Sequence, residues 1–285
     1  RKESSAASDV YKRQIEGVGN VTVTMEAMSD EQRRELKKKL RGGQAEPEIP
    51  FAKPDSTTRV FAVASGKGGV GKSSMTVNLA AALVQKGLKV GIVDADIYGH
   101  SVPNLLGCTD GPTVLDDEML LPPISHGIKH ISIGQFVEGN APVVWRGPML
   151  HRALQQFLAD VFWGDLDVLL LDLPPGTGDV ALSVAQLIPN AELLIVTTPQ
   201  AAAAEVAERA GSISQQTRQR VAGVIENMGA MVMPDGSTMD VFGSGGGQIV
   251  ADRLGVILGH EVPLLASVPL DPTLPVSYTH LTLPT

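Results

Sequence analysis

The chain has 285 residues, and its 23 Lys and Arg against 31 Asp and Glu give a formal net charge of −8. Hydrophobic residues make up 43% of the chain and charged residues 19%, a composition that allows a sizeable core and excludes a mostly disordered or fibrous protein. The acidic balance argues against sequence-independent binding of nucleic acid, and no apolar run approaches the roughly 20 residues needed to cross a bilayer. The single cysteine, Cys108, excludes an intramolecular disulfide. We therefore expect a soluble, cytoplasmic protein with no nucleic acid and no membrane among its partners.

The two ends of the chain differ from the rest. Residues 1–14 and 275–285 show no periodicity that continues into their neighbours, and we interpret both as non-native sequence. Residues 15–43 contain an alternating strand pattern followed by a capped, charged helix pattern. One strand and one helix cannot bury a core, so we expect this segment to be the remnant of a truncated domain. Residues 44–58, with three prolines and several charges, are predicted to be a linker.

Residues 59–274 alternate between short apolar runs and helical patterns. The expected strands are residues 60–64, 90–94, 131–133, 168–172, 193–197, 221–226 and 265–268. The expected helices are residues 72–85, 149–162, 181–187, 201–215 and 248–254. Strands that are apolar on both faces and separated by helices predict an α/β domain of three layers, with a mainly parallel sheet covered on both sides.

The strongest functional signal lies between the first expected strand and the first expected helix. The run Gly66-Lys-Gly-Gly-Val-Gly-Lys-Ser-Ser74 satisfies the pattern G-x-x-x-x-G-K-[ST] of phosphate-binding loops. Its glycines let successive N–H groups point at phosphate oxygens, and the following helix adds its N-terminal dipole. Lys72 is expected to reach the β- and γ-phosphates of ATP, and the Ser73 hydroxyl to ligate Mg²⁺. The candidate nucleotide-binding residues here are Gly66, Lys67, Gly68, Gly69, Val70, Gly71, Lys72, Ser73 and Ser74.

Carboxylates stand at the ends of two further strands. Asp94 and Asp96 follow one apolar run, and Asp172 ends another in the Walker B pattern. Ligands of open α/β sheets bind at the carboxyl ends of the strands. We expect Asp94 and Asp172 to support the Mg²⁺ ion while Asp96 orients the attacking water. An Asp at a strand end is ordinarily a turn or cap residue, and only the nearby phosphate loop makes the functional interpretation the better one.

Several runs together resemble one family, the Mrp/ApbC deviant Walker A ATPases, which carry or assemble iron–sulfur clusters. The runs are Asp94-Ala-Asp-Ile-Tyr-Gly-His-Ser-Val-Pro103, Trp145-Arg-Gly-Pro-Met149, Pro174-Pro-Gly-Thr-Gly-Asp179 and Glu226-Asn-Met228, beside the second lysine of the loop, Lys67. The resemblance extends from about residue 15 to residue 274, and the segment before the linker is similar to the end of a MIP18-like domain. It implies a P-loop fold of the SIMIBI type.

The resemblance also implies roles for particular residues. Lys67 would cross to the nucleotide of a second subunit in a homodimer, so that Lys67, Lys72 and Asp96 would be the catalytic residues. Asn227 would read the adenine, since an amide offers both a donor and an acceptor. The partners would be iron–sulfur apoprotein clients or assembly factors. A solvated surface lysine at 67 and an ordinary turn asparagine at 227 are the alternatives.

One departure from the family pattern concerns the cluster itself. Many members carry Cys-x-x-Cys shortly after the Asn-Met pair, whereas this chain has Met228-Gly-Ala-Met-Val-Met-Pro-Asp-Gly-Ser237 there. Residues 234–236 predict a turn between two short strands. A cluster needs thiolate ligands, typically four, so the ligands of an Fe₄S₄ cluster are not identified in this chain. Cys108 alone is better interpreted as a small packed residue, and the histidines lack metal-ligand spacing.

Three alternatives therefore stay open beside a cluster carrier. The chain can be an assembly scaffold that holds no cluster of its own, or a MinD- or ParA-like positioning ATPase. The third is a redox protein related to the nitrogenase iron protein, which needs paired cysteines bridging two subunits.

Overall fold

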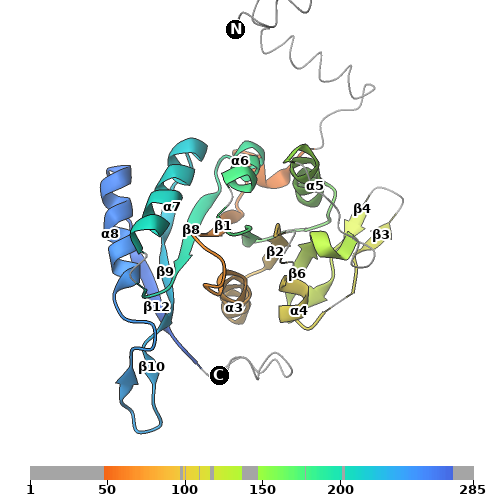
Figure 1. Ribbon diagram of the computed structural model, residues 1–285. Coiled ribbons are helices and arrows are strands. Elements are labelled where there is room, and N and C mark those ends of the chain that lie inside the picture. Colours follow the sequence, from red (N-terminus) through yellow and green to blue (C-terminus); the bar gives the residue numbers. More distant parts are fainter. Residues whose placement is uncertain are drawn as a thin grey trace, which may run out of the picture. The chain divides into compact units, whose positions relative to one another are not determined.

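The computed structural model describes residues 48–96, 99, 101–108, 110–115, 119–136, 147–176, 178–200 and 203–271 (Figure 1). The chain divides into two units, Arg1–Glu46 and Pro47–Thr285, and all described residues belong to the second. The predicted domain remnant at residues 15–43 and both end segments, 1–14 and 275–285, lie outside the described residues.

The second unit is built on an eight-stranded sheet with the strand order β12-β9-β8-β1-β7-β2-β6-β5. Every neighbouring pair is parallel except β5 and β6, which form an antiparallel edge. The strands are β1 (Arg59–Ser65), β2 (Val90–Asp94), β5 (Ile124–Ser125), β6 (Ile128–Ser132), β7 (Val168–Asp172), β8 (Glu192–Thr197), β9 (Val221–Gly229) and β12 (Leu264–Pro269). The mainly parallel sheet expected from the apolar runs is confirmed.

Helices cover both faces of the sheet, as predicted (Figure 1). The helices are α3 (Lys72–Gln85), α4 (Val102–Leu105), α5 (Gly147–Ala159), α6 (Gly178–Leu187), α7 (Ala203–Thr217) and α8 (Gly246–Leu258), with 3₁₀ turns η1 (Pro50–Ala52) and η2 (Ile133–Phe136). On β7, Leu169 packs in a cluster with Leu154 of α5 and Val184 of α6, whereas Leu170 packs with Val77 of α3. Because successive side chains of a strand point to opposite faces, both faces of the sheet are buried.

Two small antiparallel pairs lie apart from the main sheet. One joins β3 (Thr113–Leu115) to β4 (Met119–Leu121), and the other joins β10 (Met231–Val232) to β11 (Thr238–Met239). The second pair confirms the predicted turn at residues 234–236 between two short strands. Gly236 has a φ of 83°, a conformation that a glycine adopts without steric cost.

The structure moves several expected element boundaries by up to four residues, as at the end of α8 (Leu258 rather than 254), and it adds the helix α4 and the strands β3, β4 and β5. The strand expected at residues 131–133 begins earlier, at Ile128, because the polar pair Lys129 and His130 interrupts the apolar run although His130 is fully buried. The helix expected at residues 149–162 ends at Ala159, since Val161 forms a bridge to Leu120 of β4 instead. The four-residue helix α4 is too short to produce a periodic pattern.

Part of the predicted linker, residues 44–58, packs onto this domain. Phe51 is 2% exposed and lies edge-on to Trp163, with 6.4 Å between the ring centroids. Asn190 donates a hydrogen bond from Nδ2 to the Phe51 carbonyl at 3.3 Å. The Thr58 hydroxyl donates to the Leu166 carbonyl at 2.7 Å. These contacts hold residues of the predicted linker against the core of the domain.

The topology brings the motifs together at the carboxyl ends of the central strands. The phosphate loop follows β1, while Asp94 and Asp172 end the neighbouring strands β2 and β7. Asp94 and Asp172 are direct partners in the parallel register. Because the carboxyl ends of parallel strands lie on the same side of the sheet, residues far apart in sequence meet around the start of α3.

Candidate functional site

The phosphate loop runs from the end of β1 at Ser65 to the first residue of α3 at Lys72, and glycines shape it. Gly69 and Gly71 both have a φ of 79°, in the left-handed region. A Cβ on Gly71 would lie 2.3 Å from the Asn227 amide nitrogen. The loop therefore requires glycine at position 71 both for its backbone conformation and for the close approach of β9.

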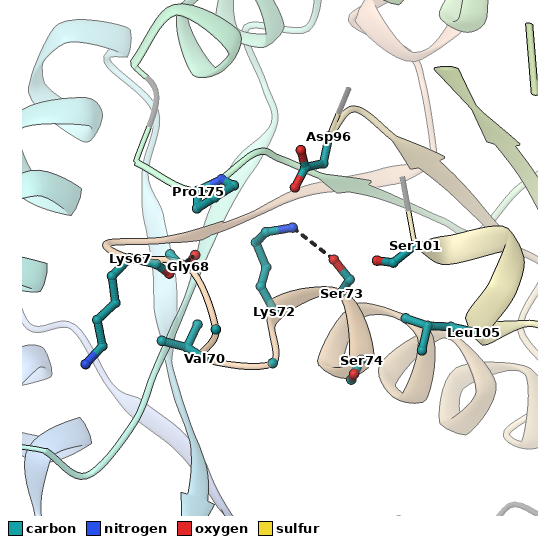
Figure 2. Close-up of a pocket in the computed structure, with 13 residues that line it drawn as sticks. Lys67, Gly68, Val70, Lys72, Ser73, Ser74, Asp96, Ser101, Leu105 and Pro175 are labelled. Carbon is teal, nitrogen blue, oxygen red and sulfur yellow. Dashed lines mark hydrogen bonds between the residues drawn. The ribbon is translucent and has the colours of Figure 1, made fainter. Parts of the chain in front are cut away.

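A cavity of about 350 Å³ opens over this loop (Figure 2). Asp96, Ser101, Leu105 and Pro175 line it opposite the loop, so segments that follow β2 and β7 complete the walls. The expected nucleotide-binding residues found in the lining are Lys67, Gly68, Gly69, Val70, Gly71, Lys72, Ser73 and Ser74. Gly66, Asp94, Asp172 and Asn227 are not among the residues that line the cavity.

Lys72, which lines the cavity, forms a buried ion pair with Asp172. The Lys72 Nζ lies 2.7 Å from Asp172 Oδ1, and the two side chains are 6% and 0% exposed. The Ser73 hydroxyl donates to Asp172 Oδ2 at 2.5 Å, and the Thr76 hydroxyl donates to Oδ1 at 2.9 Å. Lys72 also donates to Ser73 Oγ at 3.2 Å. The ammonium, hydroxyl and carboxylate that phosphoryl chemistry requires thus stand together at the helix N-terminus.

The donor atoms around Asp172 suit Mg²⁺, which prefers hard oxygen ligands. Ser73 Oγ and Asp172 Oδ2 lie within hydrogen-bond distance, so a cation between the loop and β7 meets both. Asp94 is arranged differently. Its Oδ1 accepts the Asp96 N–H, and its Oδ2 accepts the Val102 N–H and the Ser132 hydroxyl, at 3.1 to 3.2 Å. Asp94 therefore organises the segment leading to α4, and its role as a Mg²⁺ ligand stays a prediction.

The two acidic residues after β2 differ in environment. Asp94 is fully buried, and this burial, together with the charge of Asp172, raises the pKa of its carboxyl to about 7. Asp96 is 8% exposed and lines the cavity, where its Oδ1 accepts the Gly99 N–H at 3.1 Å. Figure 2 shows its carboxylate above Lys72. Asp96 is thus placed where it can face a bound nucleotide.

Lys67 does not join this group. Figure 2 shows its side chain directed away from Lys72 and Asp96, out of the cavity. Its Nζ donates to Oε1 of Gln200, an exposed residue shortly after β8, at 2.8 Å. The two lysines of the loop therefore point in different directions, one inward and one outward.

Asn227 reaches the loop from β9. Its Nδ2 donates to the Val70 carbonyl at 2.9 Å, so the amide fixes the loop, and the expected contact with adenine stays a prediction. The neighbouring Glu226 is 5% exposed and binds the N-terminus of α8, where Gly247 N–H donates to its Oε2 at 2.6 Å. The N-terminus of α8 is thus bound by a carboxylate of the chain itself.

The described residues include Cys108 and the segment that stands where many family members carry Cys-x-x-Cys. Cys108 is half-buried after α4, and the methionine-bearing segment forms the β10–β11 hairpin, on which Met239 is 49% exposed. Among the residues that the structure describes, no three His, Cys, Asp or Glu side chains gather as a metal site. Within the same residues, no helix is both long and apolar enough to span a membrane.

Three residues at the site were not expected from the sequence. Thr76 contacts Asp172, and its position four residues after Lys72, on the same face of α3, is a signal that could have identified it. Gln200 holds Lys67, and Arg209 donates from Nη1 to the Gly66 carbonyl at 2.7 Å. No local pattern marks these two, because their contacts span 133 and 143 residues.

A parallel sheet with this loop, an inward lysine and a Walker B aspartate defines a P-loop NTPase. Residues 56–280 match the family model of the NUBPL iron-transfer P-loop NTPases, and the chain belongs to this family. The resemblance inferred from the sequence motifs is confirmed.

Three of the curated relatives share one name. Proteins of Mycobacterium tuberculosis, Mycobacterium leprae and Bacillus subtilis, each named iron-sulfur cluster carrier protein, are 69%, 64% and 48% identical to the chain. The matches cover 91%, 96% and 90% of this chain and 68%, 72% and 70% of the respective relatives.

Solved structures support the fold. A nucleotide-binding protein of Archaeoglobus fulgidus in complex with ADP is 38% identical, with a TM-score of 0.64, over 77% of this chain and 85% of that one. The septum site-determining protein MinD of Pyrococcus horikoshii, complexed with Mg-ADP, is 22% identical, with a TM-score of 0.53, over 78% and 85%. At this identity the second likeness shows the fold alone.

Proposed function

We propose that the chain is an ATP-hydrolysing iron–sulfur cluster carrier or assembly protein that works as a homodimer. The observation that carries the nucleotide chemistry is the buried Lys72–Asp172 pair with Ser73, beside a cavity lined by the loop. The names of the curated relatives support the cluster chemistry.

Different residues of the site bind the phosphates of ATP, hold the Mg²⁺ ion and orient the attacking water. The loop N–H groups and the start of α3 bind the phosphates, and Lys72 places its charge on the β- and γ-oxygens. Ser73 and Asp172 would hold a Mg²⁺ ion, which neutralises charge on the transferring phosphoryl group. Asp96, which lines the cavity, orients the attacking water.

Lys67 acts on the nucleotide of the partner subunit in this proposal. A lysine that points out of its own cavity can reach a nucleotide facing it across a dimer. A cation supplied in trans stabilises the transition state as an arginine finger does, so hydrolysis depends on dimerisation. We expect Lys67→Ala to bind an ATP analogue with nearly unchanged affinity and to lose turnover. Wild-type turnover in that variant would contradict the proposal.

The cluster itself needs ligands that the family pattern does not supply here. Two copies of the chain bring only two cysteines, both Cys108, whereas a cluster is typically held by four thiolates. A bound cluster would thus need thiolates from outside these 285 residues, supplied by a client, by another component or by a further part of the same protein. The cysteine-free β10–β11 hairpin favours a second candidate, an ATP-driven assembly scaffold that holds no cluster.

Anaerobic iron–sulfur reconstitution separates these candidates, with visible absorbance and iron content as readouts. A cluster in the wild-type chain that is lost in Cys108→Ser identifies a carrier with a Cys108 site. A cluster retained in Cys108→Ser places the ligands elsewhere. No cluster, with ATP turnover intact, supports the scaffold.

A further inference from the structure

Two residues of α7 contact Gly66, the first residue of the phosphate-loop motif. Gly66 is buried, and a buried backbone carbonyl needs a hydrogen-bond donor. Arg209 supplies it, with 2.7 Å between its Nη1 and the Gly66 oxygen. A Cβ on Gly66 would lie 2.9 Å from the Val206 Cα, so the helix also fills the space beside the glycine. Val206 and Arg209 are three residues apart and therefore share one face of α7.

The peptide on the other side of Lys67 is held as well. The Ser65 hydroxyl donates to the Lys67 carbonyl at 3.0 Å, and the Ser65 carbonyl accepts the Gly176 N–H at 3.2 Å. Peptide units are planar, so fixing the carbonyls on both sides of one Cα fixes the direction in which its side chain leaves. For Lys67 that direction is out of the cavity, where its ammonium donates a hydrogen bond to Gln200.

We propose that Arg209 is a positioning residue for Lys67. By clamping the Gly66 carbonyl, it directs the lysine away from its own nucleotide and toward that of a second copy of the chain. This inference rests on the proposed function, in which Lys67 acts in trans. Arg209 does not line the cavity, whereas Gly68 to Ser74 do, so its loss affects turnover more than nucleotide affinity.

The experiment compares the wild-type chain with Arg209→Ala, Arg209→Lys and the control Arg253→Ala. Arg253 is an exposed arginine on the neighbouring helix α8, and no hydrogen bond from it to the loop occurs among the described residues. Three quantities are measured: steady-state ATP turnover, the affinity for a fluorescent ATP analogue and the thermal midpoint. Lys67→Ala and the double variant with Arg209→Ala complete a thermodynamic cycle.

Arg209→Ala should lower turnover about tenfold, the scale expected for loss of a charged hydrogen bond to a buried carbonyl. The analogue affinity should change less than about threefold, and Arg209→Lys should recover most of the turnover because an ammonium can still donate. Arg253→Ala should match the wild type. In the Lys67→Ala background, Arg209→Ala should cause no further loss, since both act through one side chain.

Three results would overturn the inference. They are wild-type turnover in Arg209→Ala, a loss of analogue affinity equal to the loss of turnover, and a further loss in the double variant. If Arg209→Ala is unfolded at the assay temperature, Arg209→Met, which keeps an aliphatic stem but has no N–H donor, replaces it with the same expectations. Wild-type turnover in Lys67→Ala overturns the proposed trans role and the inference with it. Lost turnover in Lys67→Ala beside unchanged turnover in Arg209→Ala overturns the inference alone.

Discussion

Replacing His130 with leucine should change how the stability of this protein depends on pH. His130 lies on β6 with a fully buried side chain, and neither ring nitrogen has a hydrogen-bond partner among the described residues. Burial lowers the pKa of its imidazole from 6.5 to about 4, because the charged form loses its hydration. The folded protein therefore holds this histidine neutral under conditions in which the unfolded chain protonates it.

The sign and size of the effect follow from proton linkage. The folded-state pKa lies below the unfolded value, so the unfolded chain binds more protons between pH 6.5 and 4, and stability falls as the pH falls through this range. Each unit of pKa difference corresponds to about 1.4 kcal/mol, so the full loss below pH 4 is ~3 kcal/mol, and about 1 kcal/mol of it occurs between pH 7 and 5.5.

Asp94 acts in the opposite direction over the same range. Its pKa is raised to about 7, so in the nucleotide-free protein its contribution is present at low pH and is lost as the pH rises through 7. The dependence of wild-type stability on pH therefore combines two opposing contributions, one from His130 and one from Asp94. Only the difference between the wild type and His130→Leu isolates the histidine.

The assay is urea unfolding followed by circular dichroism at several pH values from 5.5 to 7.5, at one ionic strength. His130→Leu, which has a similar volume, should gain about 1 kcal/mol relative to the wild type as the pH falls over this range. The exposed residue His260 provides the control, and His260→Ala should show no such trend. If the difference in unfolding free energy between the wild type and His130→Leu stays constant with pH, the folded protein does not hold His130 as a buried neutral imidazole.

Two further predictions concern the loop and the cavity. Gly71→Ala should destabilise the protein by ~1–3 kcal/mol and weaken nucleotide binding. The alanine would have to keep the left-handed φ of residue 71, and its Cβ would displace the Asn227 side chain. Gly69→Ala is the matched control, since it has the same φ of 79° but no atom within 4 Å of its Cβ, so urea unfolding should show the smaller loss for Gly69→Ala. Asp96→Asn should bind an ATP analogue normally and lose turnover by about 10²-fold, as expected when a water-orienting carboxylate is removed. Equal losses of binding and turnover in a steady-state ATPase assay would assign Asp96 a binding role instead.

Much of the fold could be predicted because the signals are local. The helix at Lys72–Gln85 and the strands at Val90–Asp94 and Val168–Asp172 have the expected bounds, since continuous apolar runs and a loop motif delimit them. The start of β6 was missed because Lys129 and His130 look like loop residues, and only the packed structure shows that His130 is enclosed.

The sequence by itself determined the class of fold, the phosphate loop and the aspartates that end neighbouring strands, because each depends on residue types at short, fixed spacings. Only the tertiary structure decided how the side chains use those positions. It encloses Asp94 within three hydrogen bonds, directs Lys67 outward and brings Arg209 to Gly66. These outcomes depend on how helices pack against the edge of the sheet. Contacts that join residues more than a hundred positions apart leave no period in the sequence from which they could be read.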